Sequence, residues 1–72
     1  MDIVEINRRF KYHPPSDATR DLHQALREHA IAHAHFLDEM LPGDSREKSL
    51  AFTAFEESQF WAHAHLARNL DG

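Results

Sequence analysis

The sequence predicts an all-α fold in which two helices form an antiparallel hairpin behind a short N-terminal arm. Two long segments, Ala18 to Leu41 and Ser45 to Arg68, contain neither glycine nor proline. Apolar side chains recur within both segments every three or four residues, which is the spacing of one face of a helix. Pro42, Gly43 and Asp44 form the connection, which is so short that the two helices must run antiparallel.

The arm is expected to cover residues 1–15, and the hairpin domain residues 16–72. Ile3, Ile6 and Phe10 lie at helical spacing, so part of the arm is either a short helix or an extended strap. Pro14 and Pro15 end the arm, because a residue before proline avoids the helical region.

Capping signals predict where each helix of the hairpin begins and ends. Ser16 and Asp17 are candidate N-caps of the first helix, and Pro42–Gly43 stops it. Asp44 and Glu47 have the spacing of a capping box at the start of the second helix. Residues 71–72 are expected to fray.

The periodicity also predicts which side chains lie between the helices. The stripe on the first helix is Leu22, Leu26, His29, His33, Phe36 and Met40, and that on the second is Leu50, Ala54, Glu57, Trp61 and Ala64. Antiparallel pairing then places Phe36 opposite Leu50, and His29 within hydrogen-bond reach of Glu57. Further apolar side chains, such as Ile31 and Phe52, lie outside these stripes. We therefore expect a homo-oligomer, although the arm could cover some of them.

Composition excludes several classes of protein. The chain has 72 residues, no cysteine and a net charge of −4, so it lacks the basic surface of a polymeric nucleic-acid binder. No apolar run is long enough to cross a membrane, and the first residues do not resemble an export signal, so the cytosol is the expected location. No nucleophile motif or glycine-rich loop indicates an enzyme, and no cofactor is expected.

Seven histidines are unusual in a chain of this size. His29 and His33 are one helical turn apart, which suits two ligands of one metal ion. The two Ala-His-Ala-His runs, at residues 32–35 and 62–65, do not meet in the antiparallel register, and no Glu-x-x-His pair occurs. We therefore predict no metal site, and we interpret His29 as a hydrogen-bonding partner within the hairpin.

Two stretches have the chemistry of anion binding. In the arm, Phe10, Lys11 and Tyr12 follow two arginines, so that rings for base stacking alternate with phosphate donors. The alternative is that Phe10 and Tyr12 simply pack on the helices. The second stretch begins a helix, whose free N–H groups favour an anion, and its donors are Ser45, Arg46, Lys48 and Ser49. There the alternative is an ordinary solvated helix start.

These stretches also carry a resemblance to a known family. Ser-Arg-Glu-Lys-Ser-Leu-Ala at residues 45–51, with Thr53, Glu56–Glu57, Trp61–Ala62 and Ala67–Arg68–Asn69, resembles the helical hairpin domain of phage cyclic-oligonucleotide sponges. These are the anti-CBASS and anti-Thoeris proteins. Arg9 to Pro15 is similar to their N-terminal motif, and the short chain is closer to the anti-CBASS branch. Phe52, Phe55 and the many histidines depart from the family pattern.

The resemblance implies a phage protein that binds cyclic dinucleotides and cyclic trinucleotides made by bacterial immune cyclases, without degrading them. It implies a hexamer with pockets between protomers, and Tyr12 stacked on a base with Arg27 on a phosphate. Arg46 would contribute to a ring of cations around a trinucleotide. Two other classes of function stay open at this stage, a structural hairpin that mediates protein association and a small metal-binding bundle.

Overall fold

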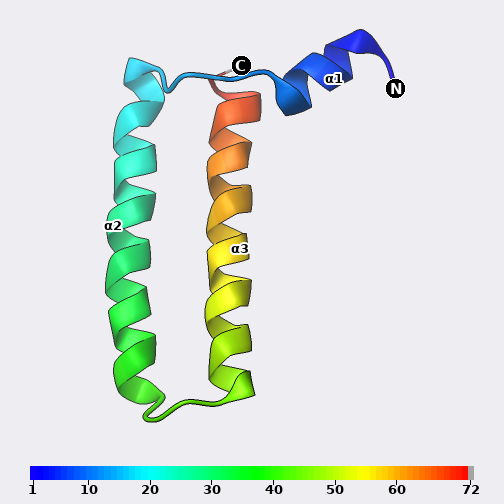
Figure 1. The fold of residues 1–72 in the computed structure, drawn as a ribbon. Helices are drawn as coiled ribbons and strands as arrows, with labels where there is room; N and C mark the ends of the chain where they lie inside the picture. Colours follow the sequence, from blue (N-terminus) through cyan, green and yellow to red (C-terminus); the bar gives the residue numbers. More distant parts are fainter. Residues whose placement is uncertain (72) are drawn as a thin grey trace.

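The computed structural model describes residues 1–71, which form three helices and no strand (Figure 1). They are α1 (Ile3–Phe10), α2 (Asp17–Met40) and α3 (Arg46–Asn69). Helices α2 and α3 lie side by side and antiparallel, while α1 projects sideways from the open end of the hairpin. None of the described helices is both long enough and apolar enough to cross a membrane. The all-α hairpin is confirmed, and the division of the chain at residue 15 stays a prediction.

Local capping explains where the helices begin. The Ser16 side chain accepts from the Thr19 N–H and the Thr19 side chain accepts from the Ser16 N–H, so a capping box starts α2. At α3 the predicted capping box is wrong by one residue. Ser45, not Asp44, is the N-cap, and its hydroxyl accepts from the Lys48 N–H at 2.9 Å. Both residue types cap well, so the sequence alone did not decide between them.

The turn between α2 and α3 is held by one lysine. Lys48 Nζ lies 2.9 Å from Asp38 Oδ1 and 3.0 Å from the carbonyl oxygen of Gly43. Gly43 has a φ of 84°, a left-handed conformation that glycine adopts without steric cost. The Lys48 bond also holds the pKa of Asp38 below its usual value. This end of the hairpin is therefore fixed by side-chain contacts as well as by chain length.

The predicted stripes do not match the faces that the two helices turn toward each other, because each helix is rotated about its own axis relative to the prediction. Leu22 is 47% exposed, Phe36 53%, Leu50 54% and Trp61 61%. The side chains that are buried or half-buried instead include Thr19, His23, Leu26, Ala30, His33 and Leu37 on α2, and Phe55, Gln59, His63 and Leu66 on α3.

Packing explains this rotation. The predicted and observed stripes share Leu26, His33 and Ala64, but small Ala30 and Ala34 leave room for phenylalanines of α3. The predicted alignment along the helix axes is correct. The register that pairs Phe36 with Leu50 also pairs His23 with His63, and the Nδ1 atoms of these two histidines are 2.7 Å apart. His29 and Glu57 are both exposed, and no hydrogen bond joins them in the described part of the chain.

The core of a single chain is very small. Leu66 is the one buried hydrophobic residue among those described, at 8% exposed, and it is accompanied by buried Thr19 and His23. Large apolar side chains along both helices of the hairpin remain open to solvent: Leu22, Ile31, Phe36, Met40, Leu50, Phe60, Trp61 and Leu70. One chain therefore leaves much of its apolar surface unburied.

The open end of the hairpin is closed by Asp71, which corrects the expectation that this residue frays. Its side chain is 0% exposed and lies 3.0 Å from His23 Nε2. It accepts from the Ser16 N–H at 3.2 Å, the Ser16 hydroxyl at 3.0 Å and the Thr19 hydroxyl. These bonds, led by that from Thr19, hold the pKa of Asp71 well below its usual range. The other residue expected to fray, at position 72, lies outside the described part.

Candidate functional site

A groove of about 350 Å³ lies where the arm meets the two long helices, and we call it the arm groove. The arm contributes Arg9, Lys11, Tyr12 and His13, α2 contributes His23, and α3 contributes Phe60, His63, Ala64, Ala67 and Arg68. None of the side chains that line it is acidic. The groove therefore combines aromatic surface with positive charge, which suits an anion that carries flat rings.

One contact folds the arm on itself, and another joins it to the end of α3. His13 Nε2 donates to the carbonyl oxygen of Arg8 at 2.9 Å, which folds the arm back on the end of α1. Arg68 reaches the carbonyl oxygen of Arg9 at 3.5 Å, and its guanidinium lies 5.9 Å from the centre of the Trp61 ring. Arg68 thus connects the arm to an aromatic side chain of α3.

The cations of the groove differ in how far their charge is already neutralised. Arg9 Nε lies 2.7 Å from Glu5 Oε1, and Arg8 forms a second bond to the same carboxylate at 2.8 Å. These arginines, Arg8 first, lower the pKa of Glu5 to about 2. Lys11 has no ion pair with any described residue. Lys11 and Arg68 are therefore the groove cations without a carboxylate partner in the described chain.

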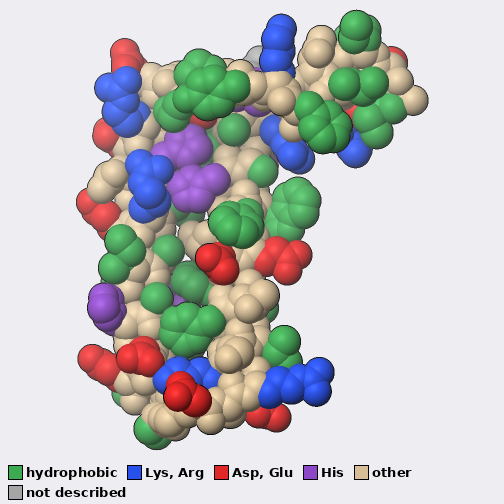
Figure 2. Space-filling model, in the orientation of Figure 1, with side chains coloured by type: hydrophobic (Ala, Val, Ile, Leu, Met, Phe, Trp, Pro, Cys, Tyr) green, Lys and Arg blue, Asp and Glu red, His purple; other side chains and the backbone are tan. Residues whose placement is uncertain are grey.

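A polar cluster of Ser16, Thr19, His23, His63 and Asp71 adjoins the groove, because His23 and His63 also line it. His23 and His63 stack with their ring centres 5.0 Å apart and 10° between ring planes. Burial lowers the pKa of His63, and the nearby His23 and Arg27 lower it further. Figure 2 shows histidine side chains between α2 and α3 near the open end, with lysine or arginine side chains on both sides.

The structure brings together only some of the residues predicted from the arm. Lys11 and Tyr12 line the groove, and Tyr12 is 81% exposed. Phe10 is 80% exposed and does not line it. The alternative that Phe10 and Tyr12 pack against the helices is therefore wrong for this chain. Arg27 lies on α2 near His63, and its guanidinium donates to Gln24 at 3.2 Å.

The second predicted stretch lies at the turn, at the other end of a molecule 47 Å long (Figure 1). Two of its side chains already have partners, because the Ser45 hydroxyl accepts a bond as the cap of α3 and the Lys48 ammonium donates to Asp38. Arg46 and Ser49 are exposed, and Arg46 has no ion pair with a described residue. The arm and the turn are therefore two separate regions within one chain.

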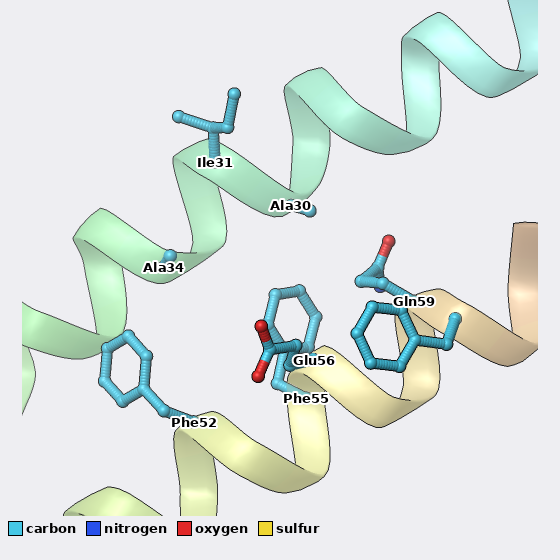
Figure 3. Close-up of a pocket in the computed structure, with 8 residues that line it drawn as sticks. Ala30, Ile31, Ala34, Phe52, Phe55, Glu56 and Gln59 are labelled. Atoms are coloured by element: carbon cyan, nitrogen blue, oxygen red, sulfur yellow. The ribbon is translucent and has the colours of Figure 1, made fainter.

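An apolar groove of about 320 Å³ runs along the middle of the hairpin (Figure 3). Phe52 and Phe55 project from α3 toward Ala30 and Ala34 of α2. Gln59 also lies in this groove, and its Oε1 atom is buried without a hydrogen-bond partner in the described chain. Apart from Glu56 and Gln59, the side chains that line this surface are apolar. It is a face on which a second apolar surface could pack.

Sequence reasoning missed four residues of the arm region: His23, His63, Arg68 and Asp71. Arg68 was noted only as part of the resemblance, and Asp71 only as a terminal residue. The useful signal was the register, because the antiparallel pairing already placed position 23 opposite position 63. No group of three or more metal-ligating side chains occurs among residues 1–71.

Comparison with known proteins agrees with this geometry. Residues 1–67 match the family model described as Acb2/Tad1, hairpin domain, so the match includes the arm and nearly all of both long helices. Searches of curated proteins and of solved structures found no match. Because the family model covers far more than half of the chain, this protein belongs to the Acb2/Tad1 hairpin domain family, whose members are phage anti-defence sponges of a binding, not a catalytic, type.

Proposed function

We propose that this protein sequesters cyclic dinucleotides and cyclic trinucleotides, the second messengers of bacterial immune cyclases, in the cytosol of the infected host. It binds them without breaking a bond, and so lowers the free concentration that reaches the effector. Membership of the Acb2/Tad1 hairpin family supports the sponge role, and the arm groove supports the class of ligand.

The observation that carries the proposal is the composition of the arm groove. A cyclic dinucleotide offers two flat bases and two phosphodiester charges. Tyr12 supplies an exposed ring on which a base can stack, and Lys11 and Arg68 supply charge that no described carboxylate neutralises. Stacking of one base on an aromatic side chain contributes about 1–3 kcal/mol, and a cation held nearby adds charge-assisted hydrogen bonds.

Arg27 is the proposed phosphate contact on α2. Arg27 does not line the arm groove itself, but its charge adds to burial in lowering the pKa of His63, which does line it. The hydrogen-bond partner of Arg27 in the free chain is the neutral side chain of Gln24. Exchanging that amide for a phosphate oxygen would replace a neutral acceptor with a charged one, which forms the stronger hydrogen bond.

The turn region is the proposed contact for a cyclic trinucleotide. Arg46 is exposed in the first turn of α3, where the helix N-terminus already favours an anion. A guanidinium can bind two phosphate oxygens at once, so copies of Arg46 around a symmetry axis would form a ring of donors. Lys48 already donates to Asp38, and Ser45 accepts a bond as the cap of α3, so within the described residues the hydroxyls of Ser45 and Ser49 can still donate to a ligand.

The proposed assembly is a hexamer. The exposed apolar side chains of α2 and α3, together with the apolar groove, need partners that one chain of this size does not provide. Copies of the same chain would bury this surface and place the arm groove of one protomer beside another. Sedimentation equilibrium tests this directly, since a folded monomer at micromolar concentration would contradict the assembly.

The decisive experiment is calorimetric titration with a panel of cyclic dinucleotides. Tyr12→Ala is expected to lower the affinity for the best-binding ligand roughly 5- to 150-fold, which is the stacking free energy converted to a ratio of dissociation constants. Phe10→Ala is the matched control, because Phe10 is an arm aromatic equally exposed but outside the groove. Arg27→Ala should also weaken binding. Unchanged affinity in both Tyr12→Ala and Arg27→Ala would refute the site.

Two further experiments distinguish binding at the turn from binding in the arm groove, and sequestration of the ligand from its degradation. Arg46→Ala is titrated with a cyclic trinucleotide and a cyclic dinucleotide in parallel. Selective loss of the trinucleotide supports two sites, and retention of both ligands makes Arg46 a solvated helix start. Chromatography of the recovered nucleotide should show it intact. Failure of every ligand to bind would leave protein association as the function of the hairpin.

A further inference from the structure

Two histidines at the open end of the hairpin, the buried His23 and the half-buried His63, form an unusual direct contact. Their Nδ1 atoms lie 2.7 Å apart, and the rings stack with only 10° between their planes. His23 continues the chain of contacts on its other side, where Nε2 lies 3.0 Å from Asp71 Oδ2. The side chain of His23 is 9% exposed and that of Asp71 is 0% exposed. The contact between His23 and Asp71 is therefore shielded from bulk water, while His63 is half-buried and lines the arm groove.

Counting protons shows which ionisation states this contact allows. A hydrogen bond between two imidazole nitrogens requires one proton, so one Nδ1 donates and the other accepts. Because the Asp71 carboxylate only accepts, His23 Nε2 must carry a proton. Two neutral rings satisfy both contacts, and so does a pair with one positive charge. Two positive rings do not, because two N–H groups would then face each other at 2.7 Å.

The surroundings of the pair oppose a second positive charge. Burial lowers the pKa of His63, the charge of Arg27 on α2 lowers it further, and Arg68 lies five residues further along α3. The arm adds Arg9, Lys11, Tyr12 and His13 to the groove above the rings. Asp71 is the one carboxylate within hydrogen-bond distance of either ring among the described residues, and it is already used by Ser16, Thr19 and His23.

The pair also holds together segments that are distant in the sequence. His23 belongs to the second turn of α2 and His63 to the last two turns of α3. Through Asp71 the same network reaches Ser16, where the arm enters α2. We propose that His23 and His63 form a one-proton latch, which closes the open end of the hairpin while at least one ring is neutral and releases it when both rings are protonated.

The direction of the effect follows from linkage. Burial lowers the pKa of His63 in the folded chain, so below its ordinary value of 6.5 the unfolded chain binds more protons. The latch therefore stabilises the fold fully above that pH, and its contribution falls as the pH drops toward the folded pKa. Release should begin at the end of α3 and at the start of α2, because these are the segments that the network joins.

Thermal unfolding as a function of pH tests the latch on the intact chain. The wild-type melting temperature is expected to fall between about pH 7.5 and about pH 5.5. His63→Gln keeps a side-chain donor for His23 but does not titrate, so it should lose most of this fall. His35→Gln is the matched control, since His35 lies exposed on α2, and it should keep the wild-type profile. Equal pH profiles for wild type and His63→Gln would overturn the proposal.

A spectroscopic measurement decides the question even if a variant fails to fold. In ¹⁵N-labelled wild-type protein at about pH 7.5, the shared proton should produce a scalar coupling between the two Nδ1 nuclei across the hydrogen bond. The coupling should disappear on acidification while amides in the middle of α2 keep their chemical shifts. Absence of the coupling at neutral pH, or independent titration of the two rings, would refute the latch.

Discussion

Replacing Thr19 with valine should destabilise the hairpin by removing one hydroxyl. Thr19 is 3% exposed, and its hydroxyl donates to the Asp71 carboxylate that closes the open end. Valine has nearly the same shape as threonine, so the substitution opens no cavity. It removes the bond to Asp71 and the Thr19 part of the capping box.

The expected magnitude follows from the charge on the acceptor. A hydrogen bond to a charged group contributes about 1.5–3 kcal/mol to stability. The Ser16 N–H keeps its bond to Asp71 at 3.2 Å, so no buried backbone donor is left without a partner. We therefore expect Thr19→Val to lower the free energy of unfolding by about 2 kcal/mol. In a domain of this size that corresponds to a fall in melting temperature of roughly 8–16 °C.

Urea unfolding at neutral pH and fixed protein concentration measures this loss. Thr53→Val is the control, because Thr53 is an exposed threonine in the middle of α3 and changes helix propensity in the same way. The control should change stability by less than about 0.5 kcal/mol. Equal losses in the two variants, or no loss in Thr19→Val, would refute the idea that the Asp71 network closes the hairpin.

Three further predictions concern the core, the arm and the turn. Leu66→Ala should cost about 2–3 kcal/mol of unfolding free energy, against less than about 1 kcal/mol for the exposed Leu70→Ala, as chemical denaturation would show. The arginines lower the pKa of Glu5 to about 2, so the ¹³C shift of the Glu5 carboxyl carbon should keep the value of the ionised group down to about pH 4 and change only as the pH falls further; replacing Arg8 and Arg9 with glutamine should move that change to higher pH. Lys48→Met removes the bonds to Asp38 and to the Gly43 carbonyl, and calorimetry should show a smaller fall in melting temperature than for Leu66→Ala.

The arrangement of the helices could be predicted from the sequence because it depends on local signals. Proline and glycine at residues 42–43 mark the turn, and Ser16 marks the start of α2. The rotation of the helices could not be predicted, since apolar residues occupy more than one side of each helix. Trp61 and Phe36 looked suited to a core, yet packing of phenylalanines against Ala30 and Ala34 turns them outward.

Part of the candidate site was also accessible from the sequence. Lys11 and Tyr12 belong to a stretch in which cations alternate with aromatic rings, and the family resemblance, more than composition, favoured stacking and phosphate binding there. The polar cluster was not accessible, because Asp71 is separated from its partner Ser16 by almost the whole chain. Its role depends on a tertiary contact at the end of α3, where the expectation for a terminal residue is fraying. The residues that complete the arm groove therefore emerge only once the hairpin is closed.

The single tryptophan gives this protein an optical reporter at a useful place. Trp61 is 61% exposed in the lone chain, so its fluorescence should have the long emission wavelength of an indole in water. Packing of another chain over Phe60 and Trp61 would shift the emission to shorter wavelength in a way that depends on protein concentration. A ligand that draws Arg68 away from the indole would instead change the emission at constant concentration. One fluorimeter can thus distinguish assembly from ligand capture without any added label.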